Sequence, residues 1–182
     1  MKLILLSAFI FFAGCNSSTL SPSAENISEI SLRMQTGLLG SASTISFAGD
    51  GAARCECTFY KLNENKKPNL DFVENICADL YRNNEQAFVK QKQTDGDVHL
   101  KAIFTGKITG QEFENITQTV RQSGFFQIVE KESNDVILDA PPNFVEVKYD
   151  GKSKQVSDAD NDLSKIISAI LETTQKTAWE KK

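Results

Sequence analysis

The sequence predicts an α+β domain with two layers, in which helices pack on one face of an antiparallel sheet. Segments in which apolar and polar residues alternate outnumber segments with helical periodicity, and several of them are joined by short glycine turns. Each helical segment has one apolar stripe, as expected for a helix that packs on a sheet. With 40% hydrophobic and 24% charged residues, the composition is that of a soluble domain. One domain over residues 27–182 is expected.

The first fifteen residues, MKLILLSAFIFFAGC, have the composition of an export signal. Lys2 precedes an apolar run over residues 3–12, which is shorter than the roughly 20 residues of a membrane-spanning helix. The run ends in Ala-Gly before Cys15. This ending resembles the lipobox of bacterial lipoprotein precursors, although Phe12 stands where the box usually has an aliphatic residue. The resemblance implies that residues 1–14 are removed as a signal peptide and that Cys15 is acylated.

Residues 15–26 are then expected to form the lipidated cysteine and a flexible, serine-rich tether. Asn16 is not the aspartate linked to inner-membrane retention, so the outer membrane is favoured and the domain faces the periplasm or the cell surface. The formal charge of −4 would become −5 without Lys2. A mildly acidic chain without a basic cluster argues against nucleic acid and anionic lipid heads as partners, so membrane attachment is expected through the lipid alone. Export without a lipid is the alternative.

The first half of the domain is predicted to contain a strand, a hairpin and a helix. Alternation begins at residue 27, and residues 35–43 are expected to connect this strand to a short one around Ile45 and Phe47. A glycine turn at 48–51 leads to a strand over 54–61, which completes the hairpin. After a polar break at 62–67, apolar residues recur at helical spacing to about residue 82.

The second half is predicted to alternate between hairpins and helices. A hairpin joins 86–93 to 98–108, and Thr109 with Glu112 forms a capping box for a helix that ends at Gly124. Phe126 and Ile128 are expected to begin another strand, and a short one is expected at 136–138. A further hairpin joins 145–149 to 152–156 through Asp-Gly. Ser157, with Asp160, is expected to cap the last helix, whose apolar stripe runs toward Trp179.

Three cysteines remain once Cys15 carries lipid: Cys55, Cys57 and Cys77. An exported protein folds in an oxidising compartment, so one disulfide is the first expectation. Cys55 and Cys57 alternate onto the same face of a strand, and either could reach Cys77. The third thiol would stay free or pair between chains. Three buried free thiols are a second possibility, and a metal site is disfavoured because no fourth ligand stands at zinc-like spacing.

The other candidate sites in the sequence are better explained as structural features or chance patterns than as catalytic or binding sites. The acidic run 158–162 resembles half of a calcium loop but lacks its glycine and its terminal glutamate, so it is interpreted as helix capping. His99, the single histidine, is expected on the solvent side of a strand. Residues 37–43 lack the Gly-Lys-Ser/Thr end of a phosphate-binding loop. Carboxylate pairs such as Glu130 with Glu132 arise by chance among 24 acidic residues. No catalytic, cofactor-binding or metal residue is therefore predicted.

Residues 27–179 resemble a domain family of unknown function found in bacterial lipoproteins and secreted proteins. Gly49-Asp50-Gly51, Asp139-Ala140-Pro141 and Trp179 match its landmarks. Two cysteines of that family are replaced here by Leu38 and Ala42, and residues 54–86 look like an insertion. The family implies no reaction.

These features predict a lipid-anchored protein of the bacterial envelope with a non-enzymatic binding or structural function. Its expected partner is another envelope protein, which would bind an apolar patch or a free sheet edge. The alternative is an exported hydrolase or thiol-redox enzyme, with a site assembled from residues far apart in the sequence.

Overall fold

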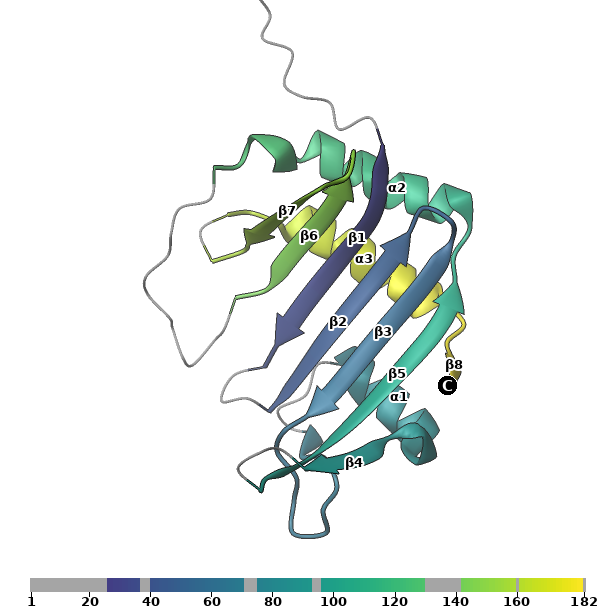
Figure 1. The fold of residues 1–182 in the computed structure, drawn as a ribbon, viewed down its shortest axis with the longest axis vertical. Coiled ribbons are helices and arrows are strands. Elements are labelled where there is room, and N and C mark those ends of the chain that lie inside the picture. The colour runs from purple at the N-terminus through teal and green to yellow at the C-terminus, as the bar shows by residue number, and fades with distance from the viewer. Residues whose placement is uncertain are drawn as a thin grey trace, which may run out of the picture.

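A computed structural model describes residues 26–36, 40–70, 75–92, 96–129, 142–159 and 161–181 of the chain. Within these residues the strands form one antiparallel sheet with the order β4-β5-β3-β2-β1-β6-β7 (Figure 1). A short strand, β8, pairs with β5 beyond the end of β4. The strands are β1 (Ile27–Gln35), β2 (Ser41–Ala48), β3 (Ala52–Phe59), β4 (Val89–Lys92), β5 (Val98–Lys107), β6 (Phe144–Tyr149), β7 (Lys152–Ser157) and β8 (Glu180–Lys181).

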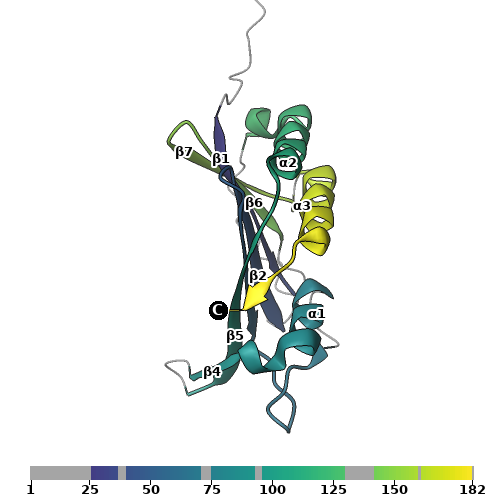
Figure 2. The same cartoon turned by 90° about the vertical axis from the view of Figure 1, so that its right-hand side faces the viewer.

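The α-helices lie together on one side of this sheet. Within the described residues they are α1 (Asn75–Asn84), α2 (Gly110–Gln122) and α3 (Ser164–Lys176), and the short 3-10 helices η3 (Glu85–Ala87) and η4 (Phe125–Gln127) follow α1 and α2. Figure 2 shows the sheet edge-on with all three α-helices on the same side, and α2 packs against α3. The predicted α+β class is therefore confirmed.

Apolar and polar residues alternate along the strands, so the sheet has one buried apolar face and one more polar face. In β1, Ile30, Leu32 and Met34 are buried, whereas Ser31 and Arg33 point to the opposite face. The inward residues of the other strands continue the same buried layer: Ile45, Phe47, Cys55, Cys57, Leu100, Ala102, Phe104, Val145 and Val147. The core lies between this layer and the helices.

Two predicted turns need a residue with positive φ. Gly51, between β2 and β3, has a φ of +87°, and a Cβ atom there would lie 2.9 Å from the carbonyl oxygen of Ile108. Asp150 and Gly151, between β6 and β7, have φ values of +47° and +71°. Two successive residues in the left-handed region are what a two-residue hairpin turn requires. Both predicted hairpins are confirmed.

The capping box of α2 is also confirmed. The Thr109 N–H donates to Glu112 Oε2 at 2.7 Å, and the Glu112 N–H donates to Thr109 Oγ1 at 3.2 Å. Beyond the helix, Gly124 has a φ of +75° and turns the chain toward η4.

Two predictions for short segments were wrong. Ser41–Ser43, expected in a connection, are the first residues of β2, because they pair with β1 on one side and with β3 on the other. Residues 126–128, expected to begin a strand, are instead the last two residues of η4 and Ile128, which caps it. Gly124 reverses the chain there and Phe125 is fully buried, so compact packing replaces an extended strand.

The predicted start of the last helix was wrong as well. Ser157 is the last residue of β7, and α3 begins only at Ser164. The Ser157 hydroxyl accepts a hydrogen bond from the N–H of Ala159, which forms a local turn at the end of the strand. The apolar stripe itself is confirmed, because Leu163, Ile166 and Ile170 are buried.

Several predictions lie outside the described residues. They are the leader and Cys15, most of the tether, residues 37–39 with Leu38, residues 71–74 at the start of the predicted helix, and the short strand at 136–138. Residues 54–59 of the predicted insertion lie in β3, between β2 and β5, and the insertion itself stays a prediction.

Candidate functional site

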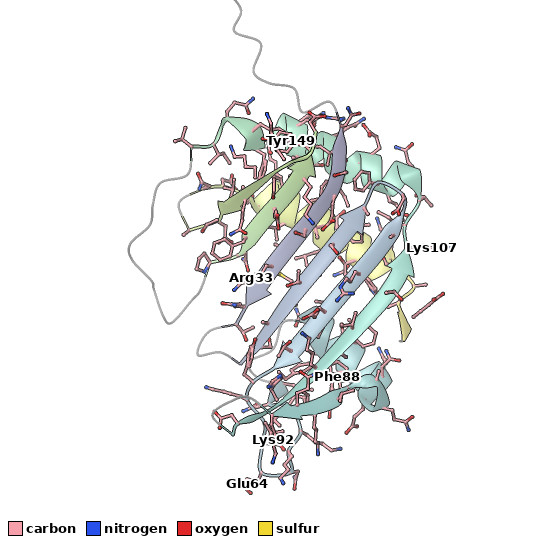
Figure 3. All side chains as sticks on the ribbon, in the orientation of Figure 1. Arg33, Glu64, Phe88, Lys92, Lys107 and Tyr149 are labelled. Carbon is pink, nitrogen blue, oxygen red and sulfur yellow. A yellow bond between two sulfur atoms is a disulfide. The ribbon has the colours of Figure 1, made fainter. Side chains whose placement is uncertain are left out.

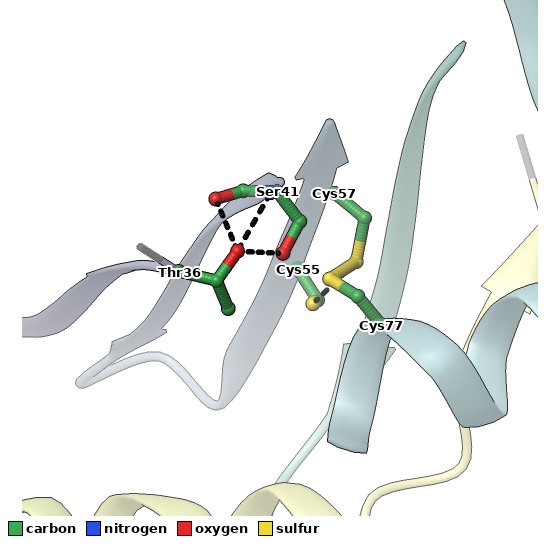
Figure 4. Close-up of a disulfide and its surroundings, with 5 residues drawn as sticks. All are labelled: Thr36, Ser41, Cys55, Cys57 and Cys77. Carbon is green, nitrogen blue, oxygen red and sulfur yellow. Dashed lines mark hydrogen bonds between the residues drawn. A yellow bond between two sulfur atoms is a disulfide. The ribbon is translucent and has the colours of Figure 1, made fainter. Parts of the chain in front are cut away.

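The three cysteines of the domain lie together between the sheet and α1 (Figure 4). Cys57 on β3 and Cys77 on α1 form a disulfide, with Cα atoms 5.8 Å apart. Cys55 is a free thiol, fully buried, and its Sγ lies 3.8 Å from Cys57 Sγ. The structure thus contains the expected single disulfide and selects Cys57 as the partner of Cys77.

The surroundings of Cys55 suppress its ionisation. Burial, with a smaller contribution from the charge of Glu56, raises the pKa of the Cys55 thiol to about 12. Because the thiolate is the reactive form, Cys55 is inert at neutral pH while the site stays closed.

Aromatic packing closes the cysteine cluster. Tyr81 on α1 and Phe88 after η3 lie edge-on or tilted against Phe59 of β3, with ring centroids 5.6 and 5.3 Å apart. Phe88 also contacts Phe104 of β5, at 5.7 Å. We call Phe59, Tyr81, Phe88 and Phe104 the aromatic seat of α1. The seat holds α1 on the sheet in addition to the disulfide.

Hydroxyl groups border the same cluster at the start of β2. The Ser41 N–H donates to Thr36 Oγ1 at 2.7 Å, and the two hydroxyls lie 3.1 Å apart. Ser43 lies opposite Cys57 in the register of β2 and β3, and its buried hydroxyl has no hydrogen-bond partner in the described part of the chain.

The face of the sheet opposite the helices is the second candidate site. We call it the open face, because none of the described helices lies over it (Figures 2 and 3). Two rows of outward side chains cross β6, β1, β2, β3 and β5 in register. The rows are Glu146, Ser31, Ser46, Arg54 and Thr105, and Phe144, Arg33, Thr44, Glu56 and Ile103. On the central strands β1 and β2, the short hydroxyl side chains Ser31, Ser46 and Thr44 thus lie beside Arg33. Longer charged side chains lie on the flanking strands.

Contacts between neighbours hold the charged groups of this face in position. Glu56 accepts from Lys101 Nζ at 2.5 Å and from Arg54 Nη2 at 3.1 Å. Partial burial acts to raise the pKa of Glu56, but the hydrogen bonds and charges of Lys101 and Arg54 outweigh it and leave the pKa below its usual range. Arg33 lies over the ring of Phe144, at 5.8 Å.

Lysines occupy both edges of the sheet. The edge strand β4 carries Lys90 and Lys92, and the opposite edge strand β7 carries Lys152 and Lys154. Lysines on edge strands disfavour the pairing of a further strand. The large apolar side chains with the greatest exposure in the described ranges, Tyr60, Val89 and Val129, come from three separate segments. The open face is therefore a better candidate for docking than either edge.

Within the described part of the chain, the remaining sequence candidates lie apart from one another and form no further site. His99 lies on the open-face side of β5, half-buried, with its ring 5.9 Å from that of Tyr60. Asp158 accepts two hydrogen bonds from Asn143, and Asp162 accepts one from the N–H of Ser164 at the start of α3. Residues 130–141, with their carboxylate pairs, lie outside the described residues. Across the described ranges, no three His, Cys, Asp or Glu side chains gather as metal ligands.

The cysteines are recognisable as a candidate site in the sequence, whereas the open face was not predicted as one. Its signal was present as hydroxyl residues at the outward positions of neighbouring strands.

Among the described helices, none is long and apolar enough to cross a membrane. No protein-family model matches the chain, and no match was found among curated proteins or solved structures.

Proposed function

We propose that the chain is a lipid-anchored protein of the bacterial envelope whose domain binds another envelope protein through the open face. The lipobox-like sequence ending at Cys15 supports the anchor, and the serine-rich stretch up to residue 26 would give the domain reach from the membrane. The domain would belong to the lipoprotein family of unknown function that its sequence resembles.

The arrangement of side chains on the open face supports binding to another protein. Its central side chains, Ser31, Thr44 and Ser46, are short, so they lose little conformational freedom when a partner covers them. The charged groups around them are already held by ion pairs, as Glu56 is by Lys101. A broad, exposed sheet face of this kind suits another folded surface better than it suits a small molecule, which needs a concave pocket.

The charge pattern favours a protein as the partner. The face carries cations and anions in alternation: Arg33, Arg54, Lys101 and Lys148 with Glu29, Glu56 and Glu146. Binding of nucleic acid or anionic lipid would require a surface on which positive charges predominate. A protein surface can place charges of both signs against this pattern, which gives specificity and orientation.

The experiment is photo-crosslinking in native membranes. A photoreactive amino acid replaces Thr44, which is exposed at the centre of the open face, and in a control it replaces Gln118, which is exposed on α2. We expect one discrete protein adduct from position 44 that is absent from position 118. Arg33→Glu in the same chain should reduce this adduct, whereas Arg121→Glu on α2 should not.

The charge reversals separate specific docking from chance capture. An adduct at position 44 that is equally strong with Arg33→Glu, or that also forms from position 118, would contradict docking at the open face. The absence of any adduct from position 44 would contradict it too.

A further inference from the structure

The cysteine cluster contains the components of an exchange reaction that the proposed binding function does not use. A thiol and a disulfide are in contact, because Cys55 Sγ lies 3.8 Å from Cys57 Sγ within the bonded pair Cys57–Cys77 (Figure 4). Thiol–disulfide exchange proceeds by attack of a thiolate on a disulfide sulfur. The disulfide sulfur that Cys55 Sγ contacts at 3.8 Å is that of Cys57.

We propose that the cluster is a thiol–disulfide exchange site, in which Cys55 replaces Cys77 as the partner of Cys57 and frees α1 from the sheet. The Cys55 thiol loses its proton and its sulfur bonds to Cys57 Sγ. The Cys57–Cys77 bond breaks, its electron pair leaves with Cys77 Sγ, and this sulfur takes up a proton. One disulfide and one thiol are present before and after, so the step needs no oxidant and no reductant.

The strand places the alternative pair within bonding range. Cys55 and Cys57 stand two residues apart on β3, so their Cα atoms are roughly 6.7 Å apart. This lies at the upper end of the range that a disulfide spans. Local adjustment of β3 is therefore required, and the original pair is favoured while α1 is seated. The exchanged form becomes favourable when α1 is held away from the sheet.

Seating of α1 also controls the rate. The buried thiol keeps its proton in the closed form, so exchange must wait until the aromatic seat opens and water reaches Cys55. Tyr81 is the member of this seat that α1 supplies. Once the seat is open, the Cys55 pKa returns toward its ordinary value and attack on Cys57 can follow. The exchange thus removes the covalent bond between α1 and the sheet, so that a transient opening of α1 becomes a lasting one. Cys77 is left as the free thiol.

The identity of the free thiol reports the reaction. The purified oxidised protein is incubated at pH 8.5 in urea below its unfolding transition. Samples are quenched in acid, denatured, labelled with N-ethylmaleimide at pH 6 and digested without reduction. Mass spectrometry then locates the label. At the start it should be on Cys55. With time it should move to Cys77, while a peptide containing a Cys55–Cys57 disulfide appears.

Variants test the opening step. Tyr81→Ala should accelerate the movement of the label from Cys55 to Cys77 about tenfold or more, because it removes the ring that α1 contributes to the aromatic seat. Val120→Ala, in the buried face of α2, is the control for general destabilisation and should accelerate it far less. If Tyr81→Ala does not fold, the urea dependence of the wild-type rate replaces it. Cys55→Ser should leave Cys77 unlabelled at all times.

Two results would overturn the proposal. One is label that stays on Cys55 at all times and urea concentrations below the transition. The other is label on Cys77 without the Cys55–Cys57 peptide, which would mean that Cys77 was released by another route.

Discussion

Lys154 Nζ, on the edge strand β7, donates a hydrogen bond to the carbonyl oxygen of Ile128 at 2.6 Å. The same ammonium group donates to the carbonyl oxygen of Phe126 at 3.0 Å. Lys154 lies opposite Val147 in the register of β6 and β7, so it points to the helix side of the sheet. A charged side chain at an inward position of an edge strand thus fixes η4 and also discourages pairing with another sheet.

Replacement of this lysine should destabilise the domain. Lys154→Met keeps much of the side-chain volume but leaves two carbonyl groups without their donor, at a cost of about 1–3 kcal/mol in the free energy of unfolding. Urea denaturation measures this change. Lys152→Met, at an exposed position of the same strand, should have little effect. Equal effects of the two substitutions would show that the contacts with η4 are unimportant for stability.

The disulfide should stabilise the domain by restricting its unfolded chain. A bridge between residues separated by 20 positions is worth about 3 kcal/mol in the chain-entropy account. We therefore expect dithiothreitol to lower the thermal midpoint of the wild-type protein and to leave that of a Cys57→Ala, Cys77→Ala double variant unchanged. The Cys55→Ala variant should keep the wild-type response. A wild-type midpoint that does not respond to the reductant would contradict the stabilising bridge.

The Cys55 thiol should make stability fall in alkaline solution. Its pKa is about 12 in the folded protein, whereas the unfolded chain releases this proton near the ordinary thiol pKa of about 8.5. The stabilisation is fully present below that ordinary pKa and is lost as pH rises toward 12. Between about pH 9 and 10, the wild-type protein should lose about 1.2 kcal/mol more than Cys55→Ala. Parallel pH profiles from urea denaturation of the two proteins would contradict the buried, protonated thiol.

Gly106 allows the C-terminal segment to approach β5. A Cβ atom at this position would lie 2.8 Å from both the carbonyl oxygen of Ala178 and Thr177 Cγ2. Gly106→Ala should displace β8 and cost about 1–3 kcal/mol. A red shift in Trp179 fluorescence would report the displacement. Gly110→Ala is the control, because a Cβ atom there meets nothing within 4 Å. An unchanged spectrum for Gly106→Ala would mean that this close approach is dispensable.

Most of the sheet could be predicted from the sequence because its two faces differ in polarity. Regular alternation predicted β1, and the Gly and Asp-Gly turns predicted the hairpins that follow. Ser41–Ser43 escaped prediction because serine and alanine favour strands only weakly, and pairing with two neighbouring strands decides their structure. The η4 error has a similar cause, since a two-residue alternation is too short to distinguish a strand from a buried turn.

The candidate sites were predictable only in part. Alternation placed Cys55 and Cys57 on one face, but the choice between them depends on where α1 lies over the sheet. Lys154 could not be assigned, because its acceptors come from residues 26 and 28 positions earlier in the chain. The open face is different, since its hydroxyl rows follow from alternation once the order of the strands is known.

Docking of the open face in the bacterial envelope depends on a lipid at Cys15, and the intact mass of the protein extracted from its own membranes reveals whether this anchor is present. We expect the mass of residues 15–182 plus acyl chains and minus two hydrogens, with one thiol that alkylates after denaturation. A mass without acyl chains would contradict the anchor and leave a soluble exported domain. Three alkylatable thiols would contradict the disulfide.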